Sequence, residues 1–293
     1  MAQSTANPRA APSGPIVERL TALTKTAQFY WWLGHVTVLV CGTLYYAKRP
    51  FGWQNANWYY PKALLGALVS YAIVVYKTYG PPQANLAFAQ RLIVDENVEY
   101  LLLAFYWYVN RPIWVTLIPF VVFSLFHVLT YVRSTLIPTI FPLVPAEIQR
   151  ARQTEQPAMS MAARVSKAMG EWSSKYYTPA LREVGVWEAA GICVWLCVGA
   201  LTLQSPLTAP VVYFQFLRMR YALSAPTRAA FRRVRTFLDG VLTPPTAHTA
   251  VPGVVTDTYI RMRDILVKMG DGIMDPSARQ PQPQPQQQQQ PQQ

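Results

Sequence analysis

Long apolar stretches, separated by short polar segments, fill most of the first two thirds of the chain. Residues 29–47 contain no formally charged side chain and are followed at once by Lys48 and Arg49. Residues 58–77 form a second stretch of similar length. A membrane-spanning helix needs about 20 predominantly apolar residues. Both stretches are therefore expected to be helices that cross a bilayer.

A third apolar stretch, residues 98–132, is too long for one upright helix. Arg111-Pro112 and Pro119 interrupt it, and proline kinks or breaks a helix. Two interpretations remain open: one tilted, kinked helix, or a hairpin that turns at Arg111-Pro112. A shorter stretch at residues 187–203 follows. The pattern predicts an all-α, polytopic helical membrane protein with about four apolar membrane segments and C-terminal amphipathic helices.

The side of the membrane on which residues 134–186 lie depends on that choice. If each long stretch crosses once, the chain has four spans, its termini share a side and this segment lies in the lumen. A hairpin moves the segment to the opposite face. Cytosolic loops carry an excess of Lys and Arg, and the six basic residues between Arg150 and Glu183 weakly favour the cytosol. Residues 134–146, with three prolines, are expected to lie at the interface.

Aromatic residues gather where the apolar stretches meet polar sequence. Tyrosine and tryptophan favour the membrane–water interface because one part of each ring system is apolar and another part is polar. An interfacial belt is therefore expected, although ordinary core packing would also explain these rings. The residues assigned to the belt are Trp31, Trp32, Trp58, Tyr59 and Tyr60.

Composition divides the chain into four regions. Residues 1–28 are expected to be a disordered segment, rich in Ala, Pro and Ser, that leads into a short amphipathic helix. Residues 29–217 form the helical membrane domain. Residues 218–275 form a basic cytosolic region with amphipathic helices, and residues 276–293 form a Gln/Pro-rich disordered tail.

The basic region contains a helix pattern that suits a membrane surface. Four apolar residues between positions 231 and 241 form one stripe, and arginines beginning at position 228 repeat on a different face. An apolar face beside a row of cations lets a helix lie in the interface, with guanidinium groups on lipid phosphate. Packing against the protein's own cytosolic face is the alternative. The residues expected to bind the membrane are Arg228, Phe231, Arg232, Arg233, Val234, Arg235, Leu238 and Val241.

A second amphipathic helix is expected between Val255 and Ile273. Its apolar positions recur in steps of three and four residues, and its polar face is balanced in charge. Lipid attraction is therefore weaker than for the first helix. Packing on a partner protein or on this chain explains the pattern equally well.

The composition supports a membrane protein and does not indicate a particular chemical activity. Charged residues make up 14% of the 293 residues, against about 25% in soluble proteins. The net charge is +12, with ten Lys/Arg against five Asp/Glu from Arg218 onward. Such a basic region suits nucleic acid or an anionic membrane surface. No nucleic-acid-binding motif accompanies it, so no direct nucleic-acid partner is expected and the membrane surface is preferred.

Catalytic, metal-binding and cofactor motifs are missing from the sequence, so no enzyme, metal site or cofactor is predicted. The three cysteines lie in apolar stretches and are expected to be buried free thiols. His35 and His127 lie in apolar helices, where a neutral imidazole hydrogen-bonded to another helix is the preferred interpretation. Arg111 either pairs with Asp95 or Glu99 or extends to the interface, and extension is preferred.

Two blocks of residues resemble a known family. The sequence DENVEYLLLAFYWYVNRPIWVTLIPFVVFSLFHVLTYVR contains Phe-Ser-Leu-Phe-His at 123–127, and a later block contains Tyr-Phe-Gln-Phe-Leu-Arg-Met-Arg-Tyr at 213–221. In this order and spacing they resemble the transmembrane protein 33 family, whose fungal members are called pore membrane proteins. The likeness covers roughly residues 20–242.

The resemblance implies a non-enzymatic, multi-pass protein of the endoplasmic reticulum membrane and the nuclear envelope. It implies partners among reticulon-type shaping proteins and nucleoporins, a possible import receptor at the basic C-terminal region, and a lipid bilayer rich in anionic lipid. The expected function is membrane shaping and organisation of the nuclear pore complex through the basic helix. A small endomembrane transporter or channel is the alternative, and a lipid-modifying enzyme is a third option that the missing catalytic motif disfavours.

Overall fold

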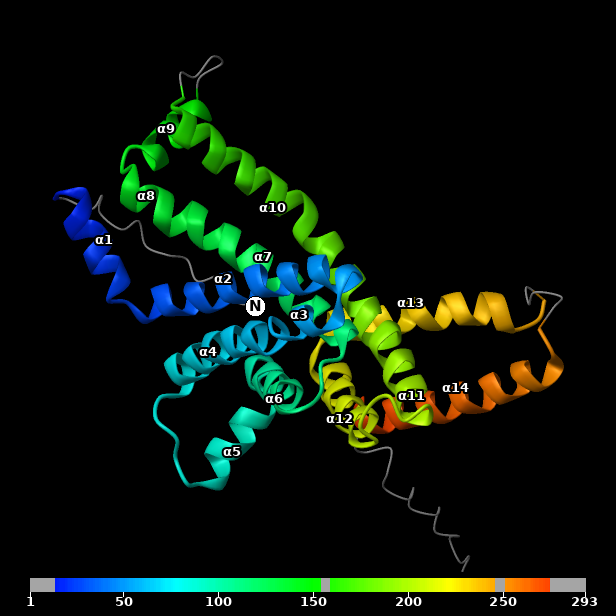
Figure 1. Cartoon of the computed structure of the whole chain (residues 1–293). Coiled ribbons are helices and arrows are strands. Elements are labelled where there is room, and N and C mark those ends of the chain that lie inside the picture. Colours follow the sequence, from blue (N-terminus) through cyan, green and yellow to red (C-terminus); the bar gives the residue numbers. More distant parts are fainter. Residues whose placement is uncertain (1–13, 154–158, 246–250, 275–293) are drawn as a thin grey trace, which may run out of the picture. The chain divides into compact units, whose positions relative to one another are not determined.

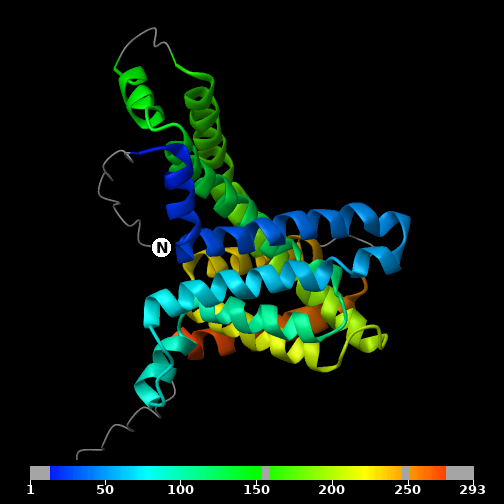
Figure 2. The same ribbon diagram turned by 60° about the vertical axis from the view of Figure 1, so that its left-hand side comes forward.

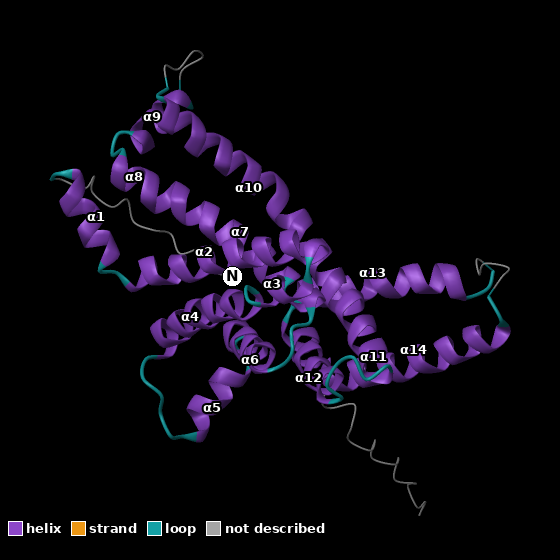
Figure 3. Ribbon diagram, viewed as in Figure 1, coloured by secondary structure: helices purple, strands orange, loops and turns teal. Residues whose placement is uncertain are grey.

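The computed structural model describes residues 14–153, 159–245 and 251–274. The expected disordered start of the chain and the Gln/Pro-rich tail lie outside these ranges. All regular structure in the described ranges is helical (Figure 3), which confirms the predicted fold class. Contacts divide the chain into two compact units, Met1–Leu217 and Arg218–Gln293, and each is described here by itself.

The helices follow one another along the chain with short connections (Figure 1). The first unit contains α1 (Ile16–Thr24), α2 (Ala27–Lys48), α3 (Trp53–Asn57), α4 (Tyr60–Tyr79), α5 (Leu86–Ile93), α6 (Glu96–Val109), α7 (Ile118–Tyr131), α8 (Ile137–Ile140), α9 (Val144–Ala151), α10 (Met161–Val186) and α11 (Cys193–Leu201). Short 3₁₀ turns lie at Arg49–Phe51 and Trp114–Thr116, and π-helical turns at Val132–Leu136 and Trp187–Ile192. Helix α12 (Thr208–Leu223) crosses the unit boundary, and α13 (Ala225–Leu242) and α14 (Gly253–Met274) follow.

Three helical stretches in the described residues are long and apolar enough to cross a membrane. They are Asn55–Tyr79, Trp114–Ile140 and Met161–Leu201. Helix α2 covers the first predicted segment, and its 22 residues reach about 33 Å at 1.5 Å per residue. It is not among the three stretches. The last stretch also includes the polar residues 161–183, because the π-helical turn at Trp187–Ile192 joins α10 to α11 without a break.

Helices α2 and α4 pack closely through small residues. A Cβ atom built on Gly66 would lie 2.6 Å from the carbonyl oxygen of Gly34, so only glycine lets the two backbones approach this far. Ser70 Oγ in α4 donates to the carbonyl oxygen of Trp31 in α2, at 2.9 Å. Small residues commonly allow such approach between membrane helices. Because Trp31 near the start of α2 meets Ser70 in the second half of α4, the two helices are antiparallel.

Helix α7 covers another side of α2 and also runs antiparallel to it. A Cβ atom on Gly42, late in α2, would overlap the side chain of Val121 early in α7. The ring of Trp32, early in α2, stacks on Tyr131 at the end of α7, with centroids 5.2 Å apart. The two helices thus have opposite directions.

The stretch 98–132 is a hairpin. Tyr79 at the end of α4 donates to Asp95 before α6, at 3.0 Å, and the rings of Tyr71 and Tyr100 stack at 5.7 Å. Helix α6 therefore runs antiparallel to α4. Helices α4 and α7 are both antiparallel to α2, so they are parallel to each other. Because α6 is antiparallel to α4, it is also antiparallel to α7. Arg111 is exposed in the turn between them, about 15 Å along α6 from Glu99, so of the two interpretations offered for Arg111 only extension fits.

The turn between α6 and α7 is held by side chains from three other segments. Tyr46 of α2 donates to the carbonyl oxygen of Trp114 at 2.6 Å, and Trp187 Nε1 donates to that of Val115 at 3.0 Å. The hydroxyl groups of Tyr60 and Thr116 are 2.7 Å apart. Tyr60 was expected in the interfacial belt, but it is buried because it forms this bond.

The next helices extend the bundle. Tyr177 of α10 contacts Phe126 of α7, with ring centroids 5.2 Å apart, and Trp187 reaches Val115 just before α7. Helix α10 is therefore antiparallel to α7. The first part of α12 returns alongside, and Tyr213 donates to the carbonyl oxygen of Glu188 at 3.0 Å.

Residues 134–146, which were expected to lie at the interface, are helical in their first half. The helix that begins with α7 continues through the π-helical turn and α8 to Ile140, despite Pro138. A π-helical turn uses i→i+5 hydrogen bonds, so the helix absorbs the proline without ending there. Only the residues beyond Ile140 form a separate short connection to α9.

These directions bring several helix termini to the end of the first unit where α2 begins, here called the N-terminal end. Arg19 Nη1 of α1 donates to the carbonyl oxygen of Thr139 after α7, at 2.6 Å, and Figure 2 shows α1 beside this part of the chain. The N-terminal end carries Arg19, Lys25, Lys77, Arg91, Arg133, Arg150, Arg152, Arg164 and Lys167. The described residues of the opposite end carry Lys48, Arg49, Lys62 and Arg111. Because the positive-inside rule counts Lys and Arg rather than net charge, it assigns the N-terminal end to the cytosol.

Engineered glycosylation sites test this orientation. A flexible insert with a sequon after Gln54 is expected to be glycosylated in microsomes, and the same insert after Gln153 is expected to stay unmodified. The reason is that the hairpin puts residues 134–153 at the same end as α1. Modification of the insert after Gln153 would contradict the arrangement, and an insert in the N-terminal segment serves as the cytosolic control.

The glycine contact between α2 and α4 makes a second prediction. Gly66→Ala forces backbone against backbone, and overpacking of this kind costs about 1–3 kcal/mol. A lower midpoint of thermal unfolding is expected for the full-length protein in detergent. Gly240→Ala in α13, where a Cβ atom meets nothing within 4 Å, is the matched control. An unchanged midpoint for Gly66→Ala would show that the contact does not limit stability.

Candidate membrane-binding surface

Helix α13 contains all eight residues that were expected to bind the membrane. Ser224 caps its start by accepting a hydrogen bond from the backbone N–H of Thr227, and Pro226 lies in the first turn, where its missing N–H costs nothing. Thr243 ends the helix and donates its hydroxyl to the carbonyl oxygen of Asp239 at 2.6 Å. The local sequence therefore sets both helix boundaries.

The apolar face of α13 is only partly covered. Phe231, Val234 and Leu238 are half-buried, and Val241 is exposed. Phe237 is 69% exposed, which makes it the most accessible large apolar side chain of the helix. Phe237 was not among the expected residues. Its spacing gave a signal, since it follows Val234 by three residues and precedes Val241 by four, on the same face.

The arginines of α13 divide into two groups. Arg232, Arg233 and Arg235 are exposed along the helix. Arg228 is half-buried, and its Nη1 donates to the carbonyl oxygens of Tyr221 and Ala222, both at 3.1 Å. These carbonyls end α12, and cationic groups at a helix C-terminus satisfy such acceptors. Arg228 thus fastens α13 to the preceding helix.

Asp239 joins α13 to α14. Its carboxylate accepts hydrogen bonds from Tyr259 at 2.8 Å and from Arg263 at 3.2 Å, and Arg235 lies 3.4 Å away on its own helix. Burial opposes ionisation of Asp239, but the hydrogen bonds from Tyr259 and Arg263 outweigh it and lower its pKa. Burial and the bond to Asp239 raise the pKa of Tyr259 to about 12, so this phenol remains a donor. We call this group the Asp239 clasp.

The clasp involves the polar flank of α13 and leaves apolar side chains accessible. On α14, Val254, Met262 and Ile265 are 77%, 59% and 58% exposed. On α13 the accessible apolar residues are Phe237 and Val241. Helix α13 thus combines accessible apolar side chains with exposed arginines. Such a combination fits the boundary between lipid headgroups and acyl chains.

The histidines of the bundle have structural contacts. His35 Nδ1 lies 2.9 Å from Ser124 Oγ of α7, and its ring centroid lies 4.5 Å from that of His127. The interpretation of His35 as an imidazole bonded to a neighbouring helix is confirmed. The thiols of Cys41, Cys193 and Cys197 are free, as expected, but none is fully buried: Cys41 and Cys193 are half-buried and Cys197 is exposed.

Glu188 is a buried polar residue that the sequence reasoning missed. Tyr100 donates its hydroxyl to Glu188 Oε1 at 2.8 Å, which connects α6 to the π-helical turn before α11. The signal was a carboxylate inside the apolar stretch 187–203, where an ionisable group is costly unless it has a partner.

The clasp predicts a pH response in the C-terminal unit. Because the pKa of Asp239 is lowered, the clasp stabilises the pair of helices above the ordinary carboxyl pKa of about 3.9 and is lost as the pH falls through the lowered value. Asp239→Asn should imitate the protonated state at pH 7. Faster hydrogen exchange of α14 amides is expected in the full-length variant. Asp257→Asn, an exposed site with the same change of charge, is the control, and equal exchange in both variants would contradict the role of the clasp.

Comparisons with known proteins agree with the residues that suggested a family. The family model described as transmembrane protein 33/nucleoporin POM33 matches residues 16–271. Tetra-spanning protein 1 of Schizosaccharomyces pombe is 32% identical over 87% of this chain and 88% of its own length. Nucleoporin POM33 of Chaetomium thermophilum is 31% identical over 83% of this chain and 88% of its own, and human transmembrane protein 33 is 22% identical over 73% and 79%. No solved structure matches the chain. The chain belongs to the transmembrane protein 33/nucleoporin POM33 family.

Proposed function

We propose that this protein is a non-enzymatic shaper of the endoplasmic reticulum and nuclear envelope membranes and that it helps to organise the nuclear pore complex. As a member of its family it is a multi-pass protein of the endoplasmic reticulum and nuclear pore membrane. The proposal of membrane shaping rests on one observation, the accessible amphipathic surface of α13.

Insertion of α13 would act on one leaflet. Phe237 and Val241 enter the acyl boundary, and the exposed arginines remain at the phosphate level. Each basic residue near an anionic leaflet contributes about 1 kcal/mol. A helix that adds area to one leaflet and not to the other favours a curved bilayer. The anionic lipid bilayer is thus the first proposed partner.

The orientation of the bundle supports the same proposal. The first unit reaches Leu217 while α12 runs toward the N-terminal end, because Phe216 contacts Tyr100 early in α6, with ring centroids 5.4 Å apart. The charge rule assigns that end to the cytosol. The chain therefore leaves the first unit, toward the basic helix, on the cytosolic side, where anionic lipid is enriched.

Proteins are the second class of proposed partner. Two relatives are named as a nucleoporin and as a pore membrane protein, which supports an association with nucleoporins. Reticulon-type shaping proteins, and an import receptor at the basic region, are further proposals from the family resemblance. The exposed Arg232 and Arg233 are the residues that an acidic receptor surface would contact.

The alternative, a small transporter or channel, has less support. It requires polar side chains along a path through the bundle, and His35, His127 and Arg111 were its candidates. His35 is 2% exposed and hydrogen-bonded to Ser124, while Arg111 lies in the turn at one end. These positions favour packing and anchoring roles.

Paired substitutions on opposite faces of α13 test the membrane role. Phe237→Asp with Val241→Asp is expected to reduce enrichment of the reconstituted full-length protein on small, highly curved vesicles relative to large ones, because both side chains lose their apolar contact. Enrichment is measured by fluorescence of single vesicles. Thr236→Asp with Gly240→Asp adds the same charge to the polar face and is the control. Equal enrichment for all three proteins would remove this helix from membrane shaping.

A further inference from the structure

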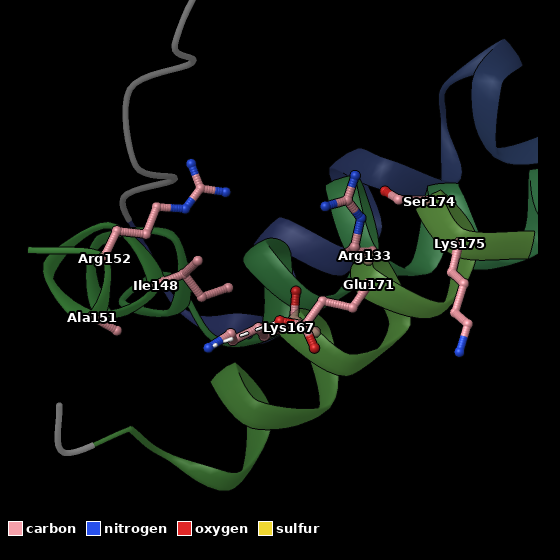
Figure 4. A pocket seen from close by; sticks show the side chains of 10 residues that line it. Arg133, Ile148, Ala151, Arg152, Lys167, Glu171, Ser174 and Lys175 are labelled. Atoms are coloured by element: carbon pink, nitrogen blue, oxygen red, sulfur yellow. Dashed lines mark ion pairs between the residues drawn. The ribbon is translucent and has the colours of Figure 1, made fainter. Parts of the chain in front are cut away.

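A basic cleft in the first unit has no role in the function proposed above. It lies between the π-helical turn after α7, helix α9 and the first half of α10, and has a volume of about 570 Å³. Figure 4 labels Arg133, Arg152, Lys167 and Lys175 in its lining, and they come from these three segments. Among the described residues, Glu171 is the one carboxylate in its lining, and it pairs with Lys167 at 3.9 Å. The balance of charge favours an anion with more than one negative charge.

The walls of the cleft are fixed by packing beneath it. Ile137, Val144 and Ala163 form a buried apolar cluster that joins α8, α9 and α10. The carboxylate of Glu147 in α9 accepts a hydrogen bond from the backbone N–H of Ser160, the cap of α10, at 2.9 Å. The cleft is therefore formed before any ligand arrives, which lowers the entropic cost of binding.

Arg133 depends on a glycine to reach its position. A Cβ atom on Gly170 would lie 2.9 Å from Arg133 Nη1 and 3.2 Å from its Cδ. The side chain of Arg133 therefore crosses α10 where α10 has no side chain of its own. A guanidinium group held in this way presents a planar pair of donors, which suits phosphate oxygens.

The position of the cleft points to lipid as the source of the phosphate. Tyr131, two residues before Arg133, stacks on Trp32, and Trp172, two residues after Gly170, stacks on Phe126 at 5.7 Å. Trp and Tyr residues near the ends of membrane segments are enriched at the membrane interface. The cleft therefore begins at the depth of lipid headgroups.

A groove with an apolar wall continues from the basic cleft. A second cavity of about 440 Å³ shares Arg133 and Arg152 with the first and adds Pro138, Val144 and Pro145. A soluble phosphate has no apolar part to place there. The glycerol and first acyl carbons of a lipid do.

We infer that this cleft binds the phosphorylated headgroup of an anionic lipid, such as an inositol phospholipid with a phosphomonoester. The guanidinium groups of Arg133 and Arg152 hold the phosphate oxygens, and Lys167 and Lys175 add charge. The size of the cleft is within the range of about 300–1,000 Å³ that small-ligand sites occupy. This site would fix the cytosolic end of the bundle to a particular lipid, and it does not rely on insertion of α13.

Direct lipid binding by the full-length protein in detergent tests the inference. Fluorescent dioctanoyl phosphatidylinositol 4-phosphate is titrated, with dioctanoyl phosphatidylcholine and free inositol 1,4-bisphosphate as comparators. Arg133→Gln with Arg152→Gln is expected to weaken binding by about tenfold, because two charge-assisted contacts are lost. Arg164→Gln with Arg182→Gln removes the same charge from α10 outside the lining, and should leave binding within about twofold, because neither side chain lines the cleft.

Two further variants distinguish binding in the cleft from nonspecific charge attraction and from misfolding. Gly170→Leu keeps every charge but displaces Arg133, so weaker binding is expected. Arg152→Gln with Lys175→Gln changes only exposed side chains and tests the cleft if the Arg133 variant does not fold. Equal weakening in the Arg164/Arg182 control would replace the site with diffuse electrostatic attraction. Equal affinity for phosphatidylcholine, or for free inositol bisphosphate, would also overturn the lipid assignment.

Discussion

The arrangement of the membrane unit depends on how the chain turns between α6 and α7. A bilayer offers no water to backbone groups that leave a helix, so irregular backbone is tolerated only where the protein supplies partners. Tyr46 and Trp187 supply hydrogen bonds to two carbonyls of this turn, and the hydroxyl of Tyr60 meets Thr116. These partners come from α2, α4 and the start of the second π-helical turn. The turn therefore ties together the helices whose directions it sets.

That turn also decides where the basic residues lie. With one kinked helix in place of the hairpin, residues 134–186 would leave the bundle at the end opposite to α1. The hairpin brings residues 134–153 back to the N-terminal end, where Arg19 bonds to Thr139. Lys and Arg then accumulate on one side of the bundle, as the positive-inside rule requires. The charge distribution and the hydrogen bonds of the turn thus support the same arrangement independently.

The sequence was sufficient for the features that repeat along it. Apolar length predicted the helices and the membrane, and the three-to-four spacing predicted α13 with all eight of its named residues. Features that depend on a distant partner were not predictable. Tyr60 looked like a belt residue because its bond to Thr116 joins positions 56 residues apart. The cleft could likewise not be predicted from the sequence, since Arg133 and Gly170 meet only after α10 folds back along α7.

The C-terminal unit shows how one acidic residue can organise a basic surface. Without Asp239, the arginines of α13 would repel one another and α14 would have no fixed partner on that flank. The carboxylate draws Arg235 and Arg263 to one side of the helix, where their charges are partly neutralised. Arg228 is also engaged, at the end of α12. Arg232 and Arg233 are exposed, beside the accessible Phe237. The strength of α13 as a membrane contact therefore depends less on its total number of arginines than on which of them the fold leaves exposed.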